Sequence, residues 1–376
     1  MELDVLNINL DILPSEMGKL MPKETAGSFQ KGICEFCFMK DKVAFPGSQP
    51  VSMSKKNWGL IKKDEYVVCE KSDGVRYLLL FYNYKMYYID RRFNIYLSTM
   101  QPFTKEQFPA CLDPERFSLF DGEMIIEKSR LSEGEKPYIC YWVFDLLVIN
   151  NYCVFRNNLY QRLYFISTLF TNPFQELYPK NDFFPFKIAL KPMYHIASSE
   201  YIWTQIVGKV LKHESDGLIY TPVALNYTPF TCKKLLKWKP AELNSVDFQM
   251  YSIQKSDHTF YRLYSSKGGI SSPFDWIMFT DDEISTYAHD GLVLECVRDH
   301  SRYTFHPIFT GNEEVTPDPQ YNDPDKGLGW SKGGWKPIRV RKDKSVGNDI
   351  KVVKGLLDCI NDDISFKELI AHINKI

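Results

Sequence analysis

Five strand-like segments follow one another between residues 66 and 149, and this run constrains the fold more than any other feature. Each segment is rich in β-branched and aromatic residues, which favour strands. Parallel strands need crossover connections of a dozen or more residues, and most of these connections are shorter. The run therefore predicts an antiparallel sheet. The segments are YVVCE (66–70), VRYLLLFYN (75–83), KMYYIDR (85–91), RFSLFDGEMIIE (116–127) and YICYWVFDLLVI (138–149).

Helical and strand patterns then complete a first domain. Two segments carry apolar residues at helical spacing, and the second follows a serine at 198 or 199 that we expect to cap it. Two strand patterns follow. We place the domain boundary between Pro240 and Asn244, so that the first domain spans residues 1–243. The helices are expected at 159–170 and 199–213, and the strands at 215–222 and 234–240.

Short strands at even spacing fill residues 244–345. Their number fits an OB-fold, a five-stranded and partly open barrel. The predicted fold class is therefore α+β: a domain of antiparallel sheets flanked by helices, followed by a C-terminal OB-fold β-barrel. The polar segment 316–334 predicts one long loop. Residues 346–376 predict C-terminal helices, for which packing against the first domain is one arrangement, and Ser365 with Glu368 predicts a capping box.

Composition indicates a globular chain. Of the 376 residues, 44% are hydrophobic and 25% are charged, which argues against disorder. No apolar run approaches the roughly 20 residues of a membrane span, and the first residues lack the basic region of a secretory signal. Nine cysteines without a regular spacing favour reduced thiols in the cytosol or nucleus. Cys34 and Cys37 have the spacing of half a zinc site, but no second pair follows, so we expect no zinc.

Basic residues are concentrated in two segments of a chain whose net charge is only −1. Residues 229–240 contain four lysines and no acid, and residues 331–345 contain six basic residues and one acid. Such clusters are usually solvated surfaces. Two of them in a balanced chain indicate a site for a polyanion.

Lys71 lies at a tight connection between two apolar strands, in the string EKSDGVR (70–76). Taken alone, its Asp-Gly pair predicts a hairpin turn. Further strings in the chain also place charged groups at the ends of strands, and each of them alone has a structural explanation. Their shared order and spacing make the set specific. The strings are FDGEMII (120–126), YWVFDLL (141–147), SDGLIYTP (215–222), LLKWKP (235–240) and WKPIRVRKDK (335–344).

These strings resemble the collinear motifs of the covalent nucleotidyltransferase superfamily, which comprises mRNA capping guanylyltransferases and polynucleotide ligases. KSDG (71–74) matches the nucleophile motif, and the resemblance covers residues 45–348. FPGSQPVSMSKKN (45–57) and NSVDF (244–248) resemble the capping branch. Ligases usually carry a glutamate at the position of Asp216 and lack the Arg-x-Asp-Lys ending.

An ATP-dependent polynucleotide ligase is the alternative function, since it shares the lysine chemistry. A third interpretation, a non-catalytic RNA-binding module on an OB-like barrel, gives no reason for a lysine at position 71.

The resemblance implies transfer of GMP from GTP to the 5′-diphosphate end of RNA, with Lys71 as the covalent nucleophile. A free lysine amine with a pKa near ~10.4 is mostly protonated, and neighbouring cations or a metal favour its neutral form. Glu123 and Asp216 are assigned to a divalent metal, Mg²⁺ or Mn²⁺, and to the ribose, because these ions prefer hard oxygen ligands.

Cations are expected around the phosphates, where they stabilise negative charge in the transition state. The resemblance assigns Lys237 and Lys239 to the α-phosphate. It assigns Arg341 and Lys344 to the departing pyrophosphate, with Asp343 holding their geometry.

A third group of residues is assigned to binding the nucleoside. Arg76 and Arg91 bind the ribose or shape its site, and Phe144 stacks on the base, although an ordinary core aromatic is an equally simple explanation. Lys191 and Ser72 are assigned to the base, with a surface lysine as the alternative for Lys191. Guanine has an acceptor at O6 where adenine has an amine donor, so a donor-only lysine would favour GTP.

Asp145, His213 and Glu295 are interpreted as structural. The N-terminal region before the motifs is too short for a domain of typical size. The resemblance therefore implies a guanylyltransferase that relies on a separate RNA 5′-triphosphatase. It also implies association with the phosphorylated C-terminal tail of RNA polymerase II, a nuclear location and no membrane.

Overall fold

The chain forms two compact units in the computed structural model. The first unit comprises Met1–Val51, Asn57–Trp238 and Ile370–Ile376, and the second comprises Ser52–Lys56 and Lys239–Leu369. No helix of the described part combines the length and hydrophobicity needed to cross a bilayer. The structure describes residues 17–37, 39, 42–99, 103–105, 108–109, 111–127, 137–177, 186–255, 257–311, 314–342 and 344–375.

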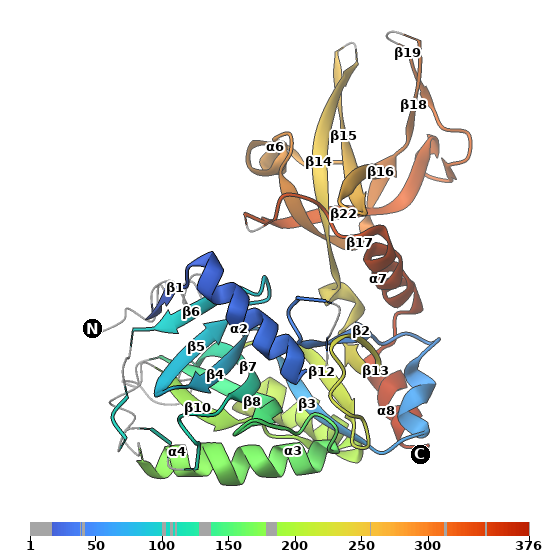
Figure 1. The fold of residues 1–376 in the computed structure, drawn as a ribbon. Coiled ribbons are helices and arrows are strands. Elements are labelled where there is room, and N and C mark those ends of the chain that lie inside the picture. Colours follow the sequence, from blue (N-terminus) through green and yellow to red (C-terminus); the bar gives the residue numbers. More distant parts are fainter. Residues whose placement is uncertain are drawn as a thin grey trace. The chain divides into compact units, whose positions relative to one another are not determined.

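A mixed sheet with the order β1-β6-β5-β4-β7-β8-β10 is the larger sheet of the first unit, and β9 pairs with β8 (Figure 1). The prediction of antiparallel pairing is confirmed for every ladder of this sheet except β8–β10, which is parallel. A parallel pair needs a long crossover, and helices occupy this one. The strands are β1 (Gly18–Leu20), β4 (Val75–Tyr82), β5 (Lys85–Ile89), β6 (Ile95–Ser98), β7 (Ser118–Glu127), β8 (Tyr138–Ile149), β9 (Tyr152–Cys153) and β10 (Phe186–Leu190).

Helices cover both faces of this sheet (Figure 1). On one face α2 (Lys23–Phe36) packs Ile33 and Cys34 into a cluster with Leu78 and Leu80 of β4. The other face carries α3 (Leu159–Ile166), a π-helical segment (Ser167–Thr171) and α4 (Asn172–Leu177).

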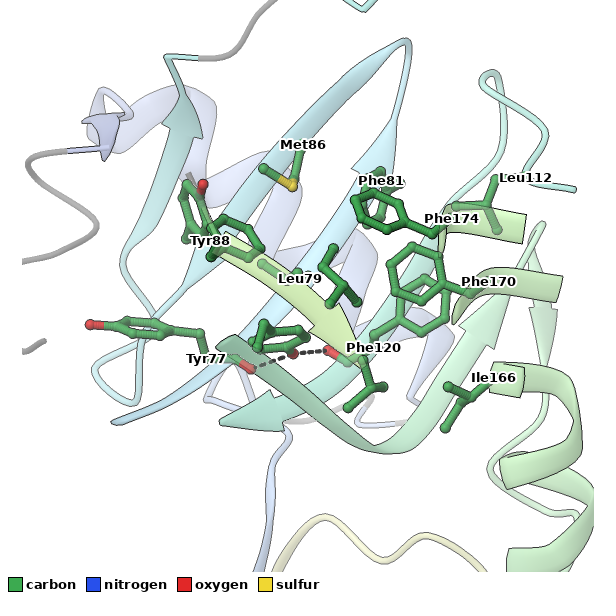
Figure 2. Close-up of a cluster of buried hydrophobic side chains, with 14 of the residues drawn as sticks. Tyr77, Leu79, Phe81, Met86, Tyr88, Leu112, Phe120, Ile166, Phe170 and Phe174 are labelled. Atoms are coloured by element: carbon green, nitrogen blue, oxygen red, sulfur yellow. Dashed lines mark hydrogen bonds between the residues drawn. The ribbon is translucent and has the colours of Figure 1, made fainter. Parts of the chain in front are cut away.

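Aromatic side chains join the second helical layer to the sheet. Phe170 stacks on Phe120 with ring centroids 4.0 Å apart, and Figure 2 shows Phe174 beside it, reaching toward Phe81. Burying one such side chain stabilises the fold by about 1.5–3 kcal/mol. The helix predicted at 159–170 is confirmed and begins at a capping box of Asn158 and Gln161.

A second, five-stranded sheet of the first unit has the order β11-β3-β12-β13-β2. Because β3 belongs to this sheet and β4 to the larger one, the chain passes between sheets at residues 73–74. The hairpin explanation of the Asp-Gly pair was therefore wrong, and so was the placement of 66–70 in the same sheet as its successors. The strands are β2 (Ser48–Ser52), β3 (Tyr66–Ser72), β11 (Tyr194–His195), β12 (Ser215–Pro222) and β13 (Phe230–Trp238).

The helix predicted at 199–213 begins at Ser199 as predicted but ends earlier, at Val210. It consists of a short α-helical turn (Ser199–Tyr201) and a π-helical segment (Ile202–Val210). The expected serine cap was wrong, because Ser198 makes no capping hydrogen bond and the Ser199 hydroxyl donates to the Ile196 carbonyl. A 3-10 turn precedes the helix, and the His195 ring caps that turn instead.

The second unit is built on a five-stranded antiparallel sheet with the order β16-β15-β14-β17-β22. Its first four strands have the order 4-1-2-3 of a Greek key, the pattern of the partly open OB barrel. Among the described ladders none joins the terminal strands β16 and β22, so hydrogen bonds do not close the barrel. The elements are β14 (Ser245–Lys255), β15 (His258–Lys267), β16 (Ile270–Ile277), α6 (Asp281–Tyr287), β17 (Val293–Phe305) and β22 (Trp330–Val340).

Short strands replace the long loop predicted at 316–334, and that prediction was wrong. The Pro, Gly and Asp residues of this segment separate short strands rather than forming one loop. Gly329, for example, has a φ of +82° and lies against Pro317, so a Cβ at this position would collide with that ring. The strands are β18 (Pro307–Thr310), β19 (Glu314–Pro317), β20 (Asn322–Asp323) and β21 (Gly327–Leu328).

Two helices end the chain, α7 (Ile350–Asp362) and α8 (Phe366–Ile373). The predicted capping box is confirmed: the Ser365 amide donates to the Glu368 carboxylate at 3.0 Å, and the Glu368 amide donates to the Ser365 hydroxyl at 3.3 Å. Val353 of α7 packs into the core of the second unit. In the first unit, the His372 ring stacks on Trp58 with centroids 4.1 Å apart.

Candidate active site

Lys71 lies near the end of β3, in a pocket of the first unit that both sheets line. Its Nζ is 2.8 Å from Oδ1 of Asp216, and about a quarter of each side chain is exposed. The β3–β12 ladder shifts register between Ser215 and Gly217, so Asp216 is left out of the pairing. Such a bulge redirects a side chain, here toward the lysine.

Gly74 allows the chain to leave β3 and enter β4 within two residues. A Cβ at this position would lie 2.5 Å from the Met124 carbonyl oxygen and 2.5 Å from the Ile125 side chain. Any larger residue would push β4 away from β7. The close approach brings β7, with Glu123, to the pocket that also contains Lys71.

Glu123 faces this pocket from β7, beside Arg91. Burial raises the pKa of Glu123, and the opposing effects of Lys191, Lys71 and Arg91 do not cancel that rise. A cation entering the pocket would therefore stabilise the ionised carboxyl. The described residues contain no cluster of three or more His, Cys, Asp or Glu side chains suited to a metal. Mg²⁺ needs only one or two carboxylates when substrate phosphates complete its shell, so Glu123 and Asp216 could hold it.

Arg76 lines the pocket and is buried in an ion pair with Asp121. Its Nε donates to Asp121 at 2.8 Å and its Nη1 to the Ser48 carbonyl at 2.5 Å, while the Tyr227 hydroxyl donates to Asp121 at 2.5 Å. The guanidinium also lies 5.4 Å from the centre of the Phe144 ring. With its nitrogens bound to protein oxygens, Arg76 is better suited to shaping the site than to binding a ribose.

Phe144 reaches the pocket because of a bulge in β8. In the β7–β8 ladder Asp121 pairs with Asp145 and Gly122 with Val143, so Phe144 has no partner. The side chain lines the pocket and is partly exposed.

Arg162 is a buried residue of the pocket lining and forms a second ion pair, with Asp145, the residue that follows Phe144. Its Nε donates to Asp145 at 2.6 Å, and its Nη1 donates to the carbonyls of Asn157 and Leu225. This supports the structural interpretation of Asp145. Sequence reasoning missed Arg162, which is only 1% exposed.

Lys191 follows β10 and is only 5% exposed, so its interpretation as a surface lysine was wrong. Its amide donates to the Val143 carbonyl at 2.8 Å, which ties the residue to β8. Its Nζ is bonded to Glu70 and to the Ser72 hydroxyl. The structure thus brings together the two residues assigned to the base.

The two lysines assigned to the α-phosphate lie at the end of β13. Lys237 pairs with Ile219 of β12, and Lys239 is the first residue of the second unit after β13. Ile219 and Leu235 line the pocket, but among its described lining residues neither lysine appears.

In the second unit, Asp247 gathers the cations assigned to the pyrophosphate. Arg341 Nη1 lies 3.1 Å from both carboxylate oxygens of Asp247, Lys344 is bonded to the same group, and Asn348 Nδ2 is 3.3 Å away. Asp343, expected to hold this geometry, lies outside the described residues. Sequence reasoning missed Asp247, although it lies in the NSVDF string that pointed to the capping branch.

Glu295 neighbours this group, and its contacts support the structural interpretation. It accepts hydrogen bonds from the Ser245 hydroxyl and from Arg339 Nε, both at 2.5 Å.

Two family models match almost the whole chain. The model described as mRNA capping enzyme, catalytic domain, matches residues 15–241, and the model described as mRNA capping enzyme, C-terminal domain, matches residues 243–370. The chain belongs to the mRNA capping enzyme family. It is therefore a nucleotidyltransferase, and the predicted membership of the capping branch is confirmed.

Individual relatives agree with this assignment. The chain is 28% identical over 385 residues to the mRNA-capping enzyme subunit alpha of Neurospora crassa, covering 94% of this chain and 90% of the relative. It is 29% identical over 435 residues to the mRNA-capping enzyme subunit alpha of Saccharomyces cerevisiae, covering 97% of this chain and 86% of that relative. Among solved structures, the ATP-dependent DNA ligase of bacteriophage T7 is 11% identical, with a TM-score of 0.36, covering 78% of this chain and 98% of that one.

The buried Arg76–Asp121 pair generates a stability prediction for this capping enzyme. Asp121→Asn leaves a guanidinium charge uncompensated in the interior, which should lower the free energy of unfolding by about 3–5 kcal/mol. Calorimetric melting would measure the loss. Asp113→Asn is the matched control, because the Arg116–Asp113 pair is exposed and such pairs contribute about 0–1 kcal/mol. Equal melting temperatures for the two variants would contradict the assigned role of Asp121.

Proposed function

We propose that this chain is an mRNA guanylyltransferase that transfers GMP from GTP to the 5′-diphosphate end of RNA through a covalent Lys71–GMP intermediate. The observation that carries the proposal is the Lys71–Asp216 pair, at 2.8 Å, whose lysine lines a pocket together with Glu123 and Lys191. Membership of the capping enzyme family favours GTP and RNA over the nicked DNA of a ligase.

In the first step the Lys71 amine attacks the α-phosphorus of GTP. A phosphorus–nitrogen bond forms, the bond to the bridging oxygen of pyrophosphate breaks, and the amine loses a proton. In the second step an oxygen of the RNA β-phosphate attacks the same phosphorus, and Lys71 leaves and regains its proton. Splitting the transfer in this way replaces one difficult step by two easier ones. Asp216 holds the amine in place before GTP enters.

A divalent cation, Mg²⁺ or Mn²⁺, would neutralise charge on the α-phosphate during both steps. Glu123 and Asp216 would hold it, since both present hard oxygens near Lys71. The raised pKa of Glu123 supports this choice, because the buried carboxyl lacks a fully compensating charge.

Guanine would be selected by Lys191 and Ser72. The lysine amine can donate to the O6 acceptor of guanine and opposes the 6-amino group of adenine. Arg91 and Phe144, which line the same pocket, are left to contact the ribose and the base. Lys237 and Lys239 would bind the α-phosphate, and Arg341 and Lys344 the pyrophosphate.

The partners follow from the same proposal. Relatives named as alpha subunits support assembly with a further subunit, and we assign that subunit the RNA 5′-triphosphatase activity that must supply diphosphate ends. Association with the phosphorylated tail of RNA polymerase II and a nuclear location complete the proposal and rest on the family resemblance.

The proposed function is tested by which nucleotide labels the protein and by which RNA end accepts the label. With Mg²⁺ or Mn²⁺ and α-labelled GTP, the protein should carry a label that survives denaturation, whereas α-labelled ATP should give little. Adding RNA with a 5′-diphosphate end should move the label to the RNA, and RNA with a 5′-monophosphate end is the control. Labelling by ATP alone, together with sealing of a nicked duplex, would favour the ligase and reject the proposal.

Arg341 and Lys344 should act in the first step only, because pyrophosphate is present only there. Arg341→Ala and Lys344→Ala should each slow adduct formation by about tenfold or more, as expected for a lost charge-assisted contact. Transfer from a preformed adduct to RNA should be unchanged. Rapid-quench measurement of each half-reaction checks this, with Lys342→Ala, an exposed neighbour, as the control. Equal losses in both half-reactions would place these side chains elsewhere.

A further inference from the structure

Four ionisable side chains form a buried cluster beside Ser72. Glu70 of β3 contacts Lys191 and His213, and His213 in turn contacts Glu127 of β7. His213 Nε2 lies 2.7 Å from Glu70 Oε1, and His213 Nδ1 lies 3.1 Å from Glu127 Oε1. Nothing in the proposed reaction uses His213 or Glu127.

The geometry of His213 fixes its protonation state. Each ring nitrogen faces a carboxylate oxygen, and an ionised carboxylate can only accept hydrogen bonds. Both bonds exist together only when both nitrogens carry protons, that is, when the ring is an imidazolium. Two positive and two negative charges then balance within the cluster. Trp142 Nε1 donates to the same Glu127 oxygen at 3.0 Å and fixes that carboxylate from the other side.

Glu70 determines where the Lys191 amine points. An ammonium has three N–H donors, and among the described residues Glu70 and Ser72 accept from Lys191. One donor is left for a ligand in the pocket, which Glu70, Ser72 and Lys191 all line. Among the described lining residues His213 and Glu127 are absent, so they act through Glu70 and through Ser72, whose hydroxyl lies 3.4 Å from His213 Nε2.

We infer that His213 is a positioning residue for base selection: its imidazolium, anchored on Glu127, holds Glu70 so that Lys191 and Ser72 face the six-position of the purine. This inference rests on the proposed function. His213 does not touch the nucleotide. Its effect is on the affinity for the correct base rather than on phosphoryl transfer.

The inference gives a direction for the pH dependence. Burial alone would lower the pKa of His213, but hydrogen bonds with Glu127 and Glu70 outweigh it and raise the pKa above its ordinary value. Selection for guanine is therefore complete at low pH and weakens as pH rises through this raised pKa, above about 6.5. Glu123, Cys69, Cys140 and Tyr194 also interact electrostatically with the cluster, and burial raises the pKa of each.

The test compares two nucleotides that differ at the six-position. Adduct formation is measured with GTP and with the triphosphate of 2,6-diaminopurine riboside, which keeps the 2-amino group but replaces O6 by an amine. Taking the ratio of kcat/KM for the two nucleotides removes the effect of triphosphate ionisation, because both nucleotides carry the same triphosphate. His213→Gln should lower this ratio about tenfold, the effect of one misplaced hydrogen bond, by raising KM for GTP with little change in kcat. The ratio should fall with rising pH in the wild type and stay flat in His213→Gln.

Controls separate the possible outcomes. His195→Gln, an exposed histidine of the same unit, should behave as wild type. Glu127→Gln breaks the same bridge from its other end and should reproduce the lowered ratio, so the test survives if His213→Gln does not fold. An unchanged ratio and pH profile in a folded variant would overturn the inference. Absence of any GTP adduct in the wild type would instead reject the proposed function.

Discussion

The close approach of β4 to β7 at Gly74 is the constraint on which the site depends. No side chain fits at this position, because the Met124 carbonyl and the Ile125 side chain occupy the space. The chain can therefore end one strand and begin the next in another sheet within two residues. A lysine three residues before this crossing lies where the two sheets meet, and only there can it share a pocket with a carboxylate of the larger sheet.

Buried ion pairs then shape the pocket in the first unit. The Arg76–Asp121 and Arg162–Asp145 pairs hold residues of the pocket wall in place, and Glu70 holds Lys191. Buried pairs of this kind contribute little net stability, because removing two charges from water costs about as much as their attraction returns. Their value is geometric. Each holds a side chain in one orientation, which the proposed discrimination between purines requires.

The structural elements that depend on local sequence pattern could be predicted from the sequence. Most strand segments, the helix from 159 and the Ser365 capping box need only near neighbours, and the motif strings carried the family assignment. Contacts between distant residues were missed. An Asp-Gly pair looks the same whether its strands pair with each other or join different sheets, so the pair alone predicted a hairpin at residues 73–74, where the chain crosses between sheets. Asp247, which holds Arg341, lies 94 positions before it.

The central claim is that the amine of Lys71 carries the nucleotide, and the most direct measurement is to locate the modification. The protein is incubated with GTP and a divalent metal, digested under mildly alkaline conditions that preserve a phosphoramidate, and analysed by tandem mass spectrometry. The account predicts GMP on the Lys71 side chain and on no other, and no modified peptide from Lys71→Arg, which keeps the charge. GMP on Lys191 or Lys237, or an adduct that persists in Lys71→Arg, would contradict it.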